Sequence, residues 1–280
     1  MKISIITVCY NAKDTIEETF LSIFNQTYKN IELVVIDGGS TDGTLEIANK
    51  YRDNISHFMS EPDKGIYDAM NKGIDYVTGD FILFLNANDV FYDNEVLQKV
   101  ADALYKNPEA EFLFGEADYI SEDGKYSQIV TYEKIKNDFS IIQNNICHQS
   151  IFYHKSLFEK FGRYSDAFKI YADWDFNIKC LVTNKVAAIY LPTVICKFQL
   201  GGACSTSSIR SVCRREKKFL IKKHYPQFLL ILSLSDFLRK NFGTPYKCLI
   251  NSFLAKKTIK LFTYQSNYKL NLLHPEDGQL

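Results

Sequence analysis

Three short runs rich in Ile, Val, Leu and Phe recur in the first 90 positions, and a helical pattern follows each of them. The runs are 2–9 (KISIITVC), 31–36 (IELVVI) and 81–85 (FILFL). Between them, apolar residues recur every three or four positions, which is typical of amphipathic helices. Strands that are apolar on both faces belong to parallel sheets covered by helices on both sides. The pattern therefore predicts an α/β, Rossmann-like fold, in which ligands bind beyond the carboxyl ends of the strands.

The other elements follow less regular patterns. A short strand is expected at 55–59, with helices at 44–51, 66–76 and about 94–105. After residue 111 we expect strands at 112–114, 126–131 and 186–191, and helices at 155–161 and 174–182. Beyond residue 205 the sequence predicts helix throughout.

Composition excludes several classes of protein. The chain has 280 residues, of which 46% are hydrophobic and 24% charged, so it can bury a core and is not intrinsically disordered. Its seven cysteines form no CxxC pair, which favours a reducing compartment over a disulfide framework or a zinc site. The first residues lack a signal-peptide pattern, and the apolar window at 225–238 is too short to span a bilayer. We therefore expect a cytoplasmic protein, at most peripheral on the inner face of the cell membrane.

The zero net charge of the chain hides an uneven distribution. Residues 1–209 carry a net charge of −10, whereas residues 210–260 carry +11. This asymmetry indicates that two parts face different partners, with a boundary near 201–208 (GGACSTSS). The basic part predicts either a helix attracted to an anionic membrane surface or a solvated helix docked on the acidic domain. No nucleic-acid partner is expected, because no recognition fold accompanies the charge.

Polar residues follow each of the three apolar strands. They are Cys9, Tyr10 and Asn11 after the first, Asp37, Gly38, Gly39 and Ser40 after the second, and Asn86, Ala87, Asn88 and Asp89 after the third. Because the carboxyl ends of parallel strands meet at one edge, we expect these residues to converge. Asp37 could bind a base or a ribose beside glycines that let the backbone approach a ligand, although a tight turn would use the same residues. No GxGxxG follows the first strand, which argues against a dinucleotide dehydrogenase.

Six ordered motifs make the sequence similar to a known family. They are SIITVCYNA, IELVVIDGGSTDGT, SEPDKGIYDAMNKGI, GDFILFLNANDV, HQSIF and ADWDF. Over residues 1–200 the chain resembles glycosyltransferase family 2, the inverting nucleotide-sugar transferases with a GT-A fold. The resemblance implies a GT-A nucleotide-diphospho-sugar transferase domain at 1–204 and a basic, mostly helical extension at 205–280. Within the domain, residues 1–110 would form the nucleotide-sugar-binding half and residues 111–204 the acceptor-side half.

The resemblance also implies a function and a donor site. The expected reaction moves a sugar from a UDP-sugar to a hydroxyl of a saccharide or lipid-linked acceptor, in cell-surface polysaccharide biosynthesis. Thr7, Cys9, Tyr10 and Asn11 match the segment that holds the nucleotide, and Asp37 with Gly38, Gly39 and Ser40 matches the loop whose carboxylate reads the base. Asp63, Lys64, Asp68 and Asn71 match residues that line the diphosphate and the sugar. Without the resemblance, Lys64 would be a solvated loop lysine, and Asp68 and Asn71 an exposed helix face.

The metal motif departs from the family pattern. Many relatives carry Asp-x-Asp and a further Asp, whereas this chain has Asn86, Ala87, Asn88 and Asp89. Asparagine oxygens are weaker ligands for Mg²⁺ or Mn²⁺, but one carboxylate and the donor diphosphate could still hold the ion. We therefore expect Asp89 to be the metal ligand and the three residues before it to contact the donor. The alternative is that Asp89 caps a turn before the next helix.

The catalytic and acceptor-side residues are also implied by the resemblance. Asp173 matches the general base of the family, which removes the acceptor proton during attack on the anomeric carbon. His148 and Gln149 match a His-Gln pair near the acceptor and the diphosphate, although a lone histidine is as often structural. Trp174 could stack on a sugar or fill the core, and Asp175 could face the acceptor or cap the helix.

Two rival functions remain at this point. A catalytically silent nucleotide-sugar-binding protein would explain Asn86 and Asn88, and a membrane adaptor would explain the basic extension. Asp173 and Asp89 argue against the first rival, and the ordered motifs of residues 1–200 argue against the second.

Overall fold

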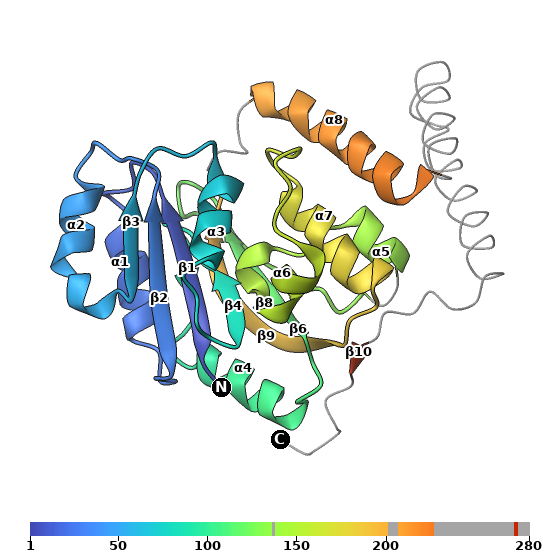
Figure 1. Ribbon diagram of the computed structural model, residues 1–280, viewed down its shortest axis with the longest axis horizontal. Helices are drawn as coiled ribbons and strands as arrows, with labels where there is room; N and C mark the ends of the chain where they lie inside the picture. The colour runs from blue at the N-terminus through green and yellow to red at the C-terminus, as the bar shows by residue number, and fades with distance from the viewer. Residues whose placement is uncertain (136–137, 201–206, 227–271, 274–280) are drawn as a thin grey trace.

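The computed structural model describes residues 1–135, 138–200, 207–226 and 272–273, and it shows a central β-sheet flanked by helices (Figure 1). Its first half contains four parallel strands: β1 (Ile3–Cys9), β2 (Ile31–Asp37), β3 (His57–Ser60) and β4 (Phe81–Phe84). They lie side by side in the order β3-β2-β1-β4. Every residue of β1 and β4 is buried, as in a sheet covered on both faces. The predicted parallel arrangement is confirmed for this half.

One helix follows each of the first three strands. These helices are α1 (Ile16–Phe24), α2 (Thr44–Lys50) and α3 (Ile66–Ile74), and a 3-10 turn (Arg52–Asn54) precedes β3. α3 lies directly against the sheet, since a Cβ atom on Gly73 would come within 2.6 Å of Ile6 Cγ2. That close approach requires glycine at position 73. After β4, α4 (Val96–Lys106) buries an apolar face close to the predicted bounds.

The α/β fold class is confirmed, but the sheet is mixed rather than parallel beyond β4. β8 (Ile151–His154), which was not predicted, is antiparallel to both β4 and β6 (Phe112–Ile120). β6 is parallel to β9 (Ala188–Gln199), and both strands extend well beyond the predicted ranges. The pairing of β6 with β9 is irregular around Gly115, and β9 contains Pro192, a residue that is rare inside strands, so the local sequence patterns predicted shorter strands.

Shorter elements complete the described residues. β5 (Val90–Phe91) pairs with β9, β7 (Ser127–Val130) pairs with β6, and β10 (Leu272–Leu273) lies parallel to β9, which gives the order β10-β9-β6-β8-β4-β1-β2-β3. The second half also contains α5 (Asp138–Gln143), a 3-10 turn (His148–Ser150), α6 (Ser156–Phe161) and α7 (Ala172–Ile178), which a π-helical turn (Lys179–Thr183) continues.

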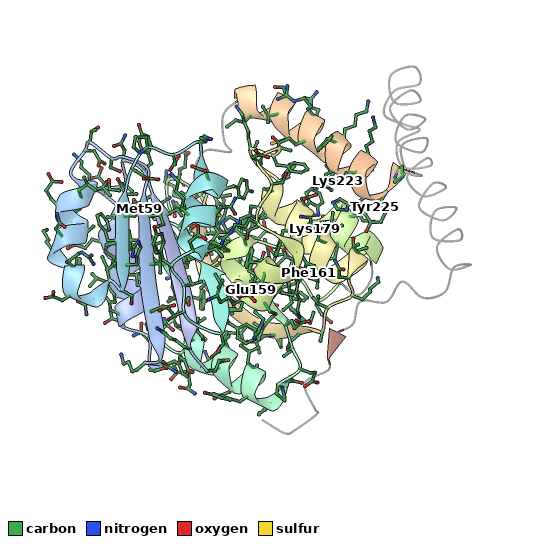
Figure 2. All side chains as sticks on the ribbon, in the orientation of Figure 1. Met59, Glu159, Phe161, Lys179, Lys223 and Tyr225 are labelled. Atoms are coloured by element: carbon green, nitrogen blue, oxygen red, sulfur yellow. The ribbon has the colours of Figure 1, made fainter. Side chains whose placement is uncertain are left out.

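α8 (Ser207–His224) is the described helix of the predicted basic extension. It packs against α7 (Figure 1), where Leu220 and Ile221 are buried and both Lys223 and His224 bind Asp175. In Figure 2, Lys223 of α8 and Lys179 at the end of α7 lie near each other, and Asp175 is within reach of both. α8 is therefore docked on the acidic domain, one of the two arrangements that the charge pattern predicted.

The rest of the predicted extension is only partly covered. The boundary expected at 204/205 and residues 227–271 and 274–280 lie outside the described residues. β10 is a strand, so the extension is not helical throughout. Within the described ranges, no helix has the length and apolar character needed to cross a membrane.

Candidate active site

The carboxyl ends of β1, β2 and β4 meet at one edge of the sheet, as predicted. Cys9 of β1 pairs with Asp37 of β2 in the parallel register, and the Cys9 carbonyl accepts a hydrogen bond from Gly38 N–H at 2.9 Å. Ala87, which follows β4, donates its N–H to the Val8 carbonyl at 3.1 Å. The three polar segments that follow these strands therefore form one site.

Asp37 is fully buried and holds the turn that follows β2. Its Oδ2 accepts hydrogen bonds from the N–H groups of Gly39 and Ser40, both at 2.9 Å, and from Ser60 Oγ at 2.7 Å. The Ser40 hydroxyl donates to Oδ1. Burial alone would raise the pKa of Asp37, but these hydrogen bonds outweigh it and lower that pKa. Asp37 is thus ionised, and its buried carboxylate stabilises the turn through these hydrogen bonds.

Tyr10, Gly38 and Asp63 form a close group at this edge, where the Tyr10 ring is accessible, with 65% of the residue exposed. A Cβ atom on Gly38 would lie 2.5 Å from Asp63 Oδ2, so the Asp63 carboxylate keeps this position because residue 38 is glycine, and it would lie 3.4 Å from the Tyr10 ring, an ordinary contact. Asn11 links two strand ends, since its N–H donates to Ser40 Oγ at 2.7 Å. It does so with a positive φ of 48°, which asparagine tolerates better than most residues.

The predicted donor residues at the start of α3 divide into two kinds. Asp68 accepts a hydrogen bond from Lys64 N–H at 3.1 Å, and Asn71 uses both ends of its amide on the Tyr164 backbone, at 2.9 and 3.0 Å. These two side chains brace the local backbone. Lys64 is exposed and Asp63 is half-buried, so their side chains are accessible to a ligand.

Asp173 lies in the first turn of α7 and is almost completely buried. Its Oδ1 accepts hydrogen bonds from the Tyr67 hydroxyl at 2.9 Å and from Trp174 N–H at 2.8 Å. Its Oδ2 accepts one from Asn145 Nδ2 at 2.8 Å and lies 3.3 Å from His148 Nδ1. Burial and the charge of Asp173 raise the pKa of Tyr67 well above its ordinary value, so the phenol stays protonated and donates. Four donors therefore orient this carboxylate.

His148 connects Asp173 to the end of β4. Its Nε2 lies 3.0 Å from Asn86 Nδ2, which donates to a neutral imidazole that carries its proton on Nδ1. A charged imidazolium would instead donate from Nε2 to the Asn86 oxygen, with the amide turned over. Burial lowers the pKa of His148, but the hydrogen bond to Asp173 and its charge outweigh this effect and raise that pKa above 6.5. Asn86 Oδ1 and Thr7 Oγ1 are buried and lack a hydrogen-bond partner among the described residues. Because a buried oxygen without a partner is costly, both atoms mark where a bound group is expected.

Asp89 is 3% exposed and is held from two sides. Gln149 Nε2 donates to its Oδ2 at 2.7 Å, and Gln199 N–H donates to its Oδ1 at 3.2 Å. Burial raises the pKa of Asp89 to about 6, although these hydrogen bonds oppose the rise. No group of three or more His, Cys, Asp or Glu side chains that could hold a metal occurs in the described part of the chain. Asp89 and the unpartnered Asn86 oxygen therefore fit Mg²⁺ or Mn²⁺ only when phosphate oxygens and water complete the ligand set.

Trp174 and Asp175, which were predicted on the acceptor side, both lie in the protein interior. Trp174 is 3% exposed and donates its ring N–H to the Ile141 carbonyl at 2.7 Å. Asp175 is 1% exposed and binds Lys223 and His224 of α8. Trp174 therefore fills the core, which was one of the two interpretations given for it above, and Asp175 binds α8.

Four residues of this network were not predicted: Tyr67, Asn145, Gln199 and Glu216. The first two bind Asp173, Gln199 binds Asp89, and Glu216 of α8 binds the backbone just before α7. Glu216 carried a recognisable signal, because it is the single acid among seven basic residues between positions 210 and 223. Tyr67 lies inside one of the six motifs, whereas Asn145 and Gln199 have no local signal.

The family model of Glycosyl transferase family 2 matches residues 4–162, which is more than half of the chain. The chain belongs to glycosyl transferase family 2. This family 2 member is 34% identical over 207 residues to the PGL/p-HBAD biosynthesis glycosyltransferase of Mycobacterium bovis (strain BCG / Pasteur 1173P2). That match covers 72% of this chain and 79% of the relative. The chain is therefore a glycosyltransferase, as the motifs implied.

Solved structures share the fold of this glycosyltransferase. The crystal structure of S. aureus TarS 1-349 in complex with UDP-GlcNAc matches it with a TM-score of 0.64 and 19% identity, over 80% of this chain and 68% of that one. The mannosyltransferase PcManGT from Pyrobaculum calidifontis, in complex with GDP-Man and Mn²⁺, matches with a TM-score of 0.56 and 17% identity, over 89% and 68%. These likenesses confirm the α/β fold of the GT-A type.

Proposed function

We propose that this glycosyltransferase moves a sugar from a UDP-sugar to a hydroxyl of a saccharide or lipid-linked acceptor, with inversion, in cell-surface polysaccharide biosynthesis. The observation that carries the proposal is Asp173, a buried carboxylate that four donors orient beside the end of β4. In an inverting transfer, one carboxylate takes the acceptor proton while the hydroxyl attacks opposite the leaving diphosphate. Asp173 is the general base in this proposal.

The donor is assigned to the edge where β1, β2 and β4 end. The exposed Tyr10 ring offers a surface for the base, and Gly38 and Gly39 let the backbone approach the nucleotide. Lys64 is proposed to bind the diphosphate, and Asn86, Ala87 and Asn88 are proposed to bind the sugar. The UDP-GlcNAc held by TarS and the GDP-Man held by PcManGT support a nucleotide-sugar donor.

A divalent cation, Mg²⁺ or Mn²⁺, is assigned to Asp89 and Asn86. When bound, it would neutralise charge on the diphosphate leaving group. The unpartnered Asn86 oxygen and the Mn²⁺ of the PcManGT complex support this assignment. Because only one carboxylate is present, we expect the ion to be held weakly in the absence of donor.

On the acceptor side, His148 is proposed to orient Asp173, which is its hydrogen-bond partner. Gln149 is proposed to hold Asp89 in the same way, because it donates a hydrogen bond to that carboxylate. Trp174 and Asp175 are reassigned to the scaffold, because their side chains are buried and bound within the protein.

The working place of the enzyme is proposed to be the cytoplasmic face of the cell membrane. The outer face of α8, formed by Arg214, Arg215, Lys218 and Lys222, is exposed. Spacings of three and four residues place these side chains on one side of the helix. Each basic residue near an anionic lipid surface contributes about 1 kcal/mol. The described cysteines are free thiols, which supports a reducing compartment.

A panel of nucleotide sugars tests the proposed reaction. UDP-glucose, UDP-galactose, UDP-N-acetylglucosamine and GDP-mannose are each added to the full-length protein with and without Mn²⁺, and the melting temperature is recorded. A true donor at about 100 times its Kd should stabilise the protein by about 2.7 kcal/mol. NMR of the released or transferred sugar should show the inverted anomer. A retained anomer would contradict the inverting mechanism, and a shift with GDP-mannose alone would contradict the UDP-sugar assignment.

A further inference from the structure

One carboxylate of α8 reaches the segment that leads into α7. Glu216 is 6% exposed, and its oxygens accept hydrogen bonds from three consecutive backbone N–H groups. These belong to Lys169 at 2.8 Å, Ile170 at 3.0 Å and Tyr171 at 3.2 Å. A carboxylate suits this set, because it accepts several hydrogen bonds at once and makes stronger ones than a neutral oxygen. The next helix, α7, carries Asp173 in its first turn.

The same backbone is held from its other side by α3. The Tyr67 hydroxyl shares its single proton between two acceptors, the Ile170 carbonyl at 2.5 Å and Asp173 Oδ1 at 2.9 Å. Ile170 therefore has its N–H bound by α8 and its carbonyl bound by α3. Asp173 follows three residues after Ile170, so its position depends on these two hydrogen bonds.

α8 makes two further contacts, one on each side of residues 169–171. The Phe219 ring lies 5.4 Å from the Phe168 ring, just before Lys169, and Lys217 Nζ lies 4.9 Å from the centre of the Trp174 ring, just after Asp173. α8 thus touches the segment on both sides of the Glu216 hydrogen bonds.

We infer that Glu216 is a positioning residue for the proposed general base: it fixes the backbone of residues 169–171 so that Asp173 keeps its place beside Tyr67 and His148. The inference rests on the proposed function, in which Asp173 takes the acceptor proton. α8 has separate anchors in the Lys223–Asp175 ion pair and the buried Leu220. The carboxylate of Glu216 therefore serves the segment before Asp173 and is not the sole attachment of the helix.

Glu216→Gln in the full-length chain tests the inference. Glutamine keeps the shape but replaces one accepting oxygen with an NH₂ group, so at least one of the three N–H groups loses its partner. We expect kcat with the panel donor that gives the largest thermal shift to fall about 10- to 100-fold, and its Kd to change less than about twofold, because a small misplacement of a catalytic group costs rate rather than donor binding. The matched control is Ile221→Val, which trims a buried α8 side chain outside these hydrogen bonds and should leave kcat unchanged.

A double-mutant cycle with Tyr67→Phe makes the test specific. Both changes loosen the Ile170 peptide, so their combined effect on kcat should be smaller than the product of the separate effects. Independent, multiplicative effects would overturn the inference. Should Glu216→Gln melt below the assay temperature, Glu216→Asp is assayed in its place, and the same loss of kcat at constant Kd is required.

Asp173→Asn, measured in parallel, separates the two possible failures. If Asp173→Asn keeps full turnover, the base assignment of the proposed function is wrong, and the inference falls with it. If Asp173→Asn abolishes turnover while Glu216→Gln lowers kcat no more than Ile221→Val does, only the positioning role of Glu216 is overturned.

Discussion

His148 Nδ1 lies 3.3 Å from Asp173 Oδ2, and this is the longest of the four contacts between that carboxylate and its donors. The other three, from Tyr67, Trp174 N–H and Asn145, measure 2.9, 2.8 and 2.8 Å. An acceptor hydroxyl that donates to Asp173 must displace or share one of these contacts, and the longest one costs least to give up. In the proposed mechanism, the acceptor hydroxyl is therefore expected beside Oδ2, on the His148 side.

Asp173→Asn should lower kcat by about 100- to 10,000-fold, the usual contribution of a general base. Donor affinity should stay near the wild-type value, because the amide has the same shape and other residues form the proposed donor site. UDP release and calorimetric donor binding, measured on one preparation, give both quantities. Asp166→Asn, the same change at an exposed aspartate, is the matched control and should leave both kcat and donor affinity unchanged. Near wild-type turnover in Asp173→Asn would remove Asp173 from the role of base.

The raised pKa of His148 predicts a pH-dependent contribution to stability. Because the folded-state pKa lies above 6.5, the stability that His148 gains beside Asp173 is fully present below about pH 6.5 and is lost as the pH rises through the raised value. The advantage of wild type over His148→Gln in the free energy of unfolding should therefore shrink as the pH rises above about 6.5. Urea unfolding across this range measures it. An advantage that stays constant with pH would contradict the charged pair.

The strand ends of the site could be predicted because their signals are local. The apolar runs of β1, β2 and β4 are contiguous in sequence, and the polar residues that follow them must share an edge once the strands are parallel. The same reasoning could not predict how Asp37 would be used. Its partner Ser60 is 23 positions away, and together with Ser40 it turns the carboxylate inward.

The partners of Asp173 and Asp89 could not be predicted, because they meet only after folding. Tyr67 and Asp173 are 106 positions apart, and Gln199 and Asp89 are 110 positions apart. The lengths of β6 and β9 were also underestimated. Both strands mix polar and apolar residues, and the pairing of two segments that are distant in sequence produces no periodic pattern in either of them.

Asp89→Asn should raise stability while weakening the response to metal. The folded-state pKa of Asp89 is about 6 and its ordinary value is 3.8, so folding disfavours the ionised form, and stability is lost as the pH rises through about 6. Without metal at pH 7.5, the variant should therefore be more stable than wild type, by at most about 3 kcal/mol. With donor and Mn²⁺ present, wild type should gain more than the variant. Thermal melts in chelator and in Mn²⁺ measure both effects.

Two outcomes would contradict this assignment of the metal. An equal response of wild type and Asp89→Asn to Mn²⁺ would show that Asp89 is not a ligand. Full transfer by wild type in excess chelator would indicate a site without metal, in which Lys64 neutralises the diphosphate. Lys64→Gln should then abolish donor binding in chelator, whereas with a metal it should only weaken it.

Neutralising the basic residues of the outer face of α8, by changing Arg214, Arg215, Lys218 and Lys222 to Gln, should release the enzyme from anionic vesicles. At about 1 kcal/mol for each basic residue, the four changes should weaken binding roughly 100- to 1,000-fold. Flotation with phosphatidylglycerol vesicles at low salt measures the loss. Truncation after Ser208 is a poorer test, because it also removes Glu216 and Lys223, which bind the α7 region.

The matched control loses the same charge from other surfaces, through changes of the exposed Lys29, Lys50, Lys106 and Lys125 to Gln. It should float like wild type, because charges that lie beyond a Debye length of about 8 Å from the lipid are largely screened at physiological salt. Equal release of the two variants would mean that net charge, and not the outer face of α8, governs binding. Salt weakens any electrostatic contact, including one within the protein, so neutral phosphatidylcholine vesicles make the deciding comparison. If wild type floats no better with anionic than with neutral vesicles at low salt, the membrane assignment is wrong, and α8 serves the catalytic domain alone.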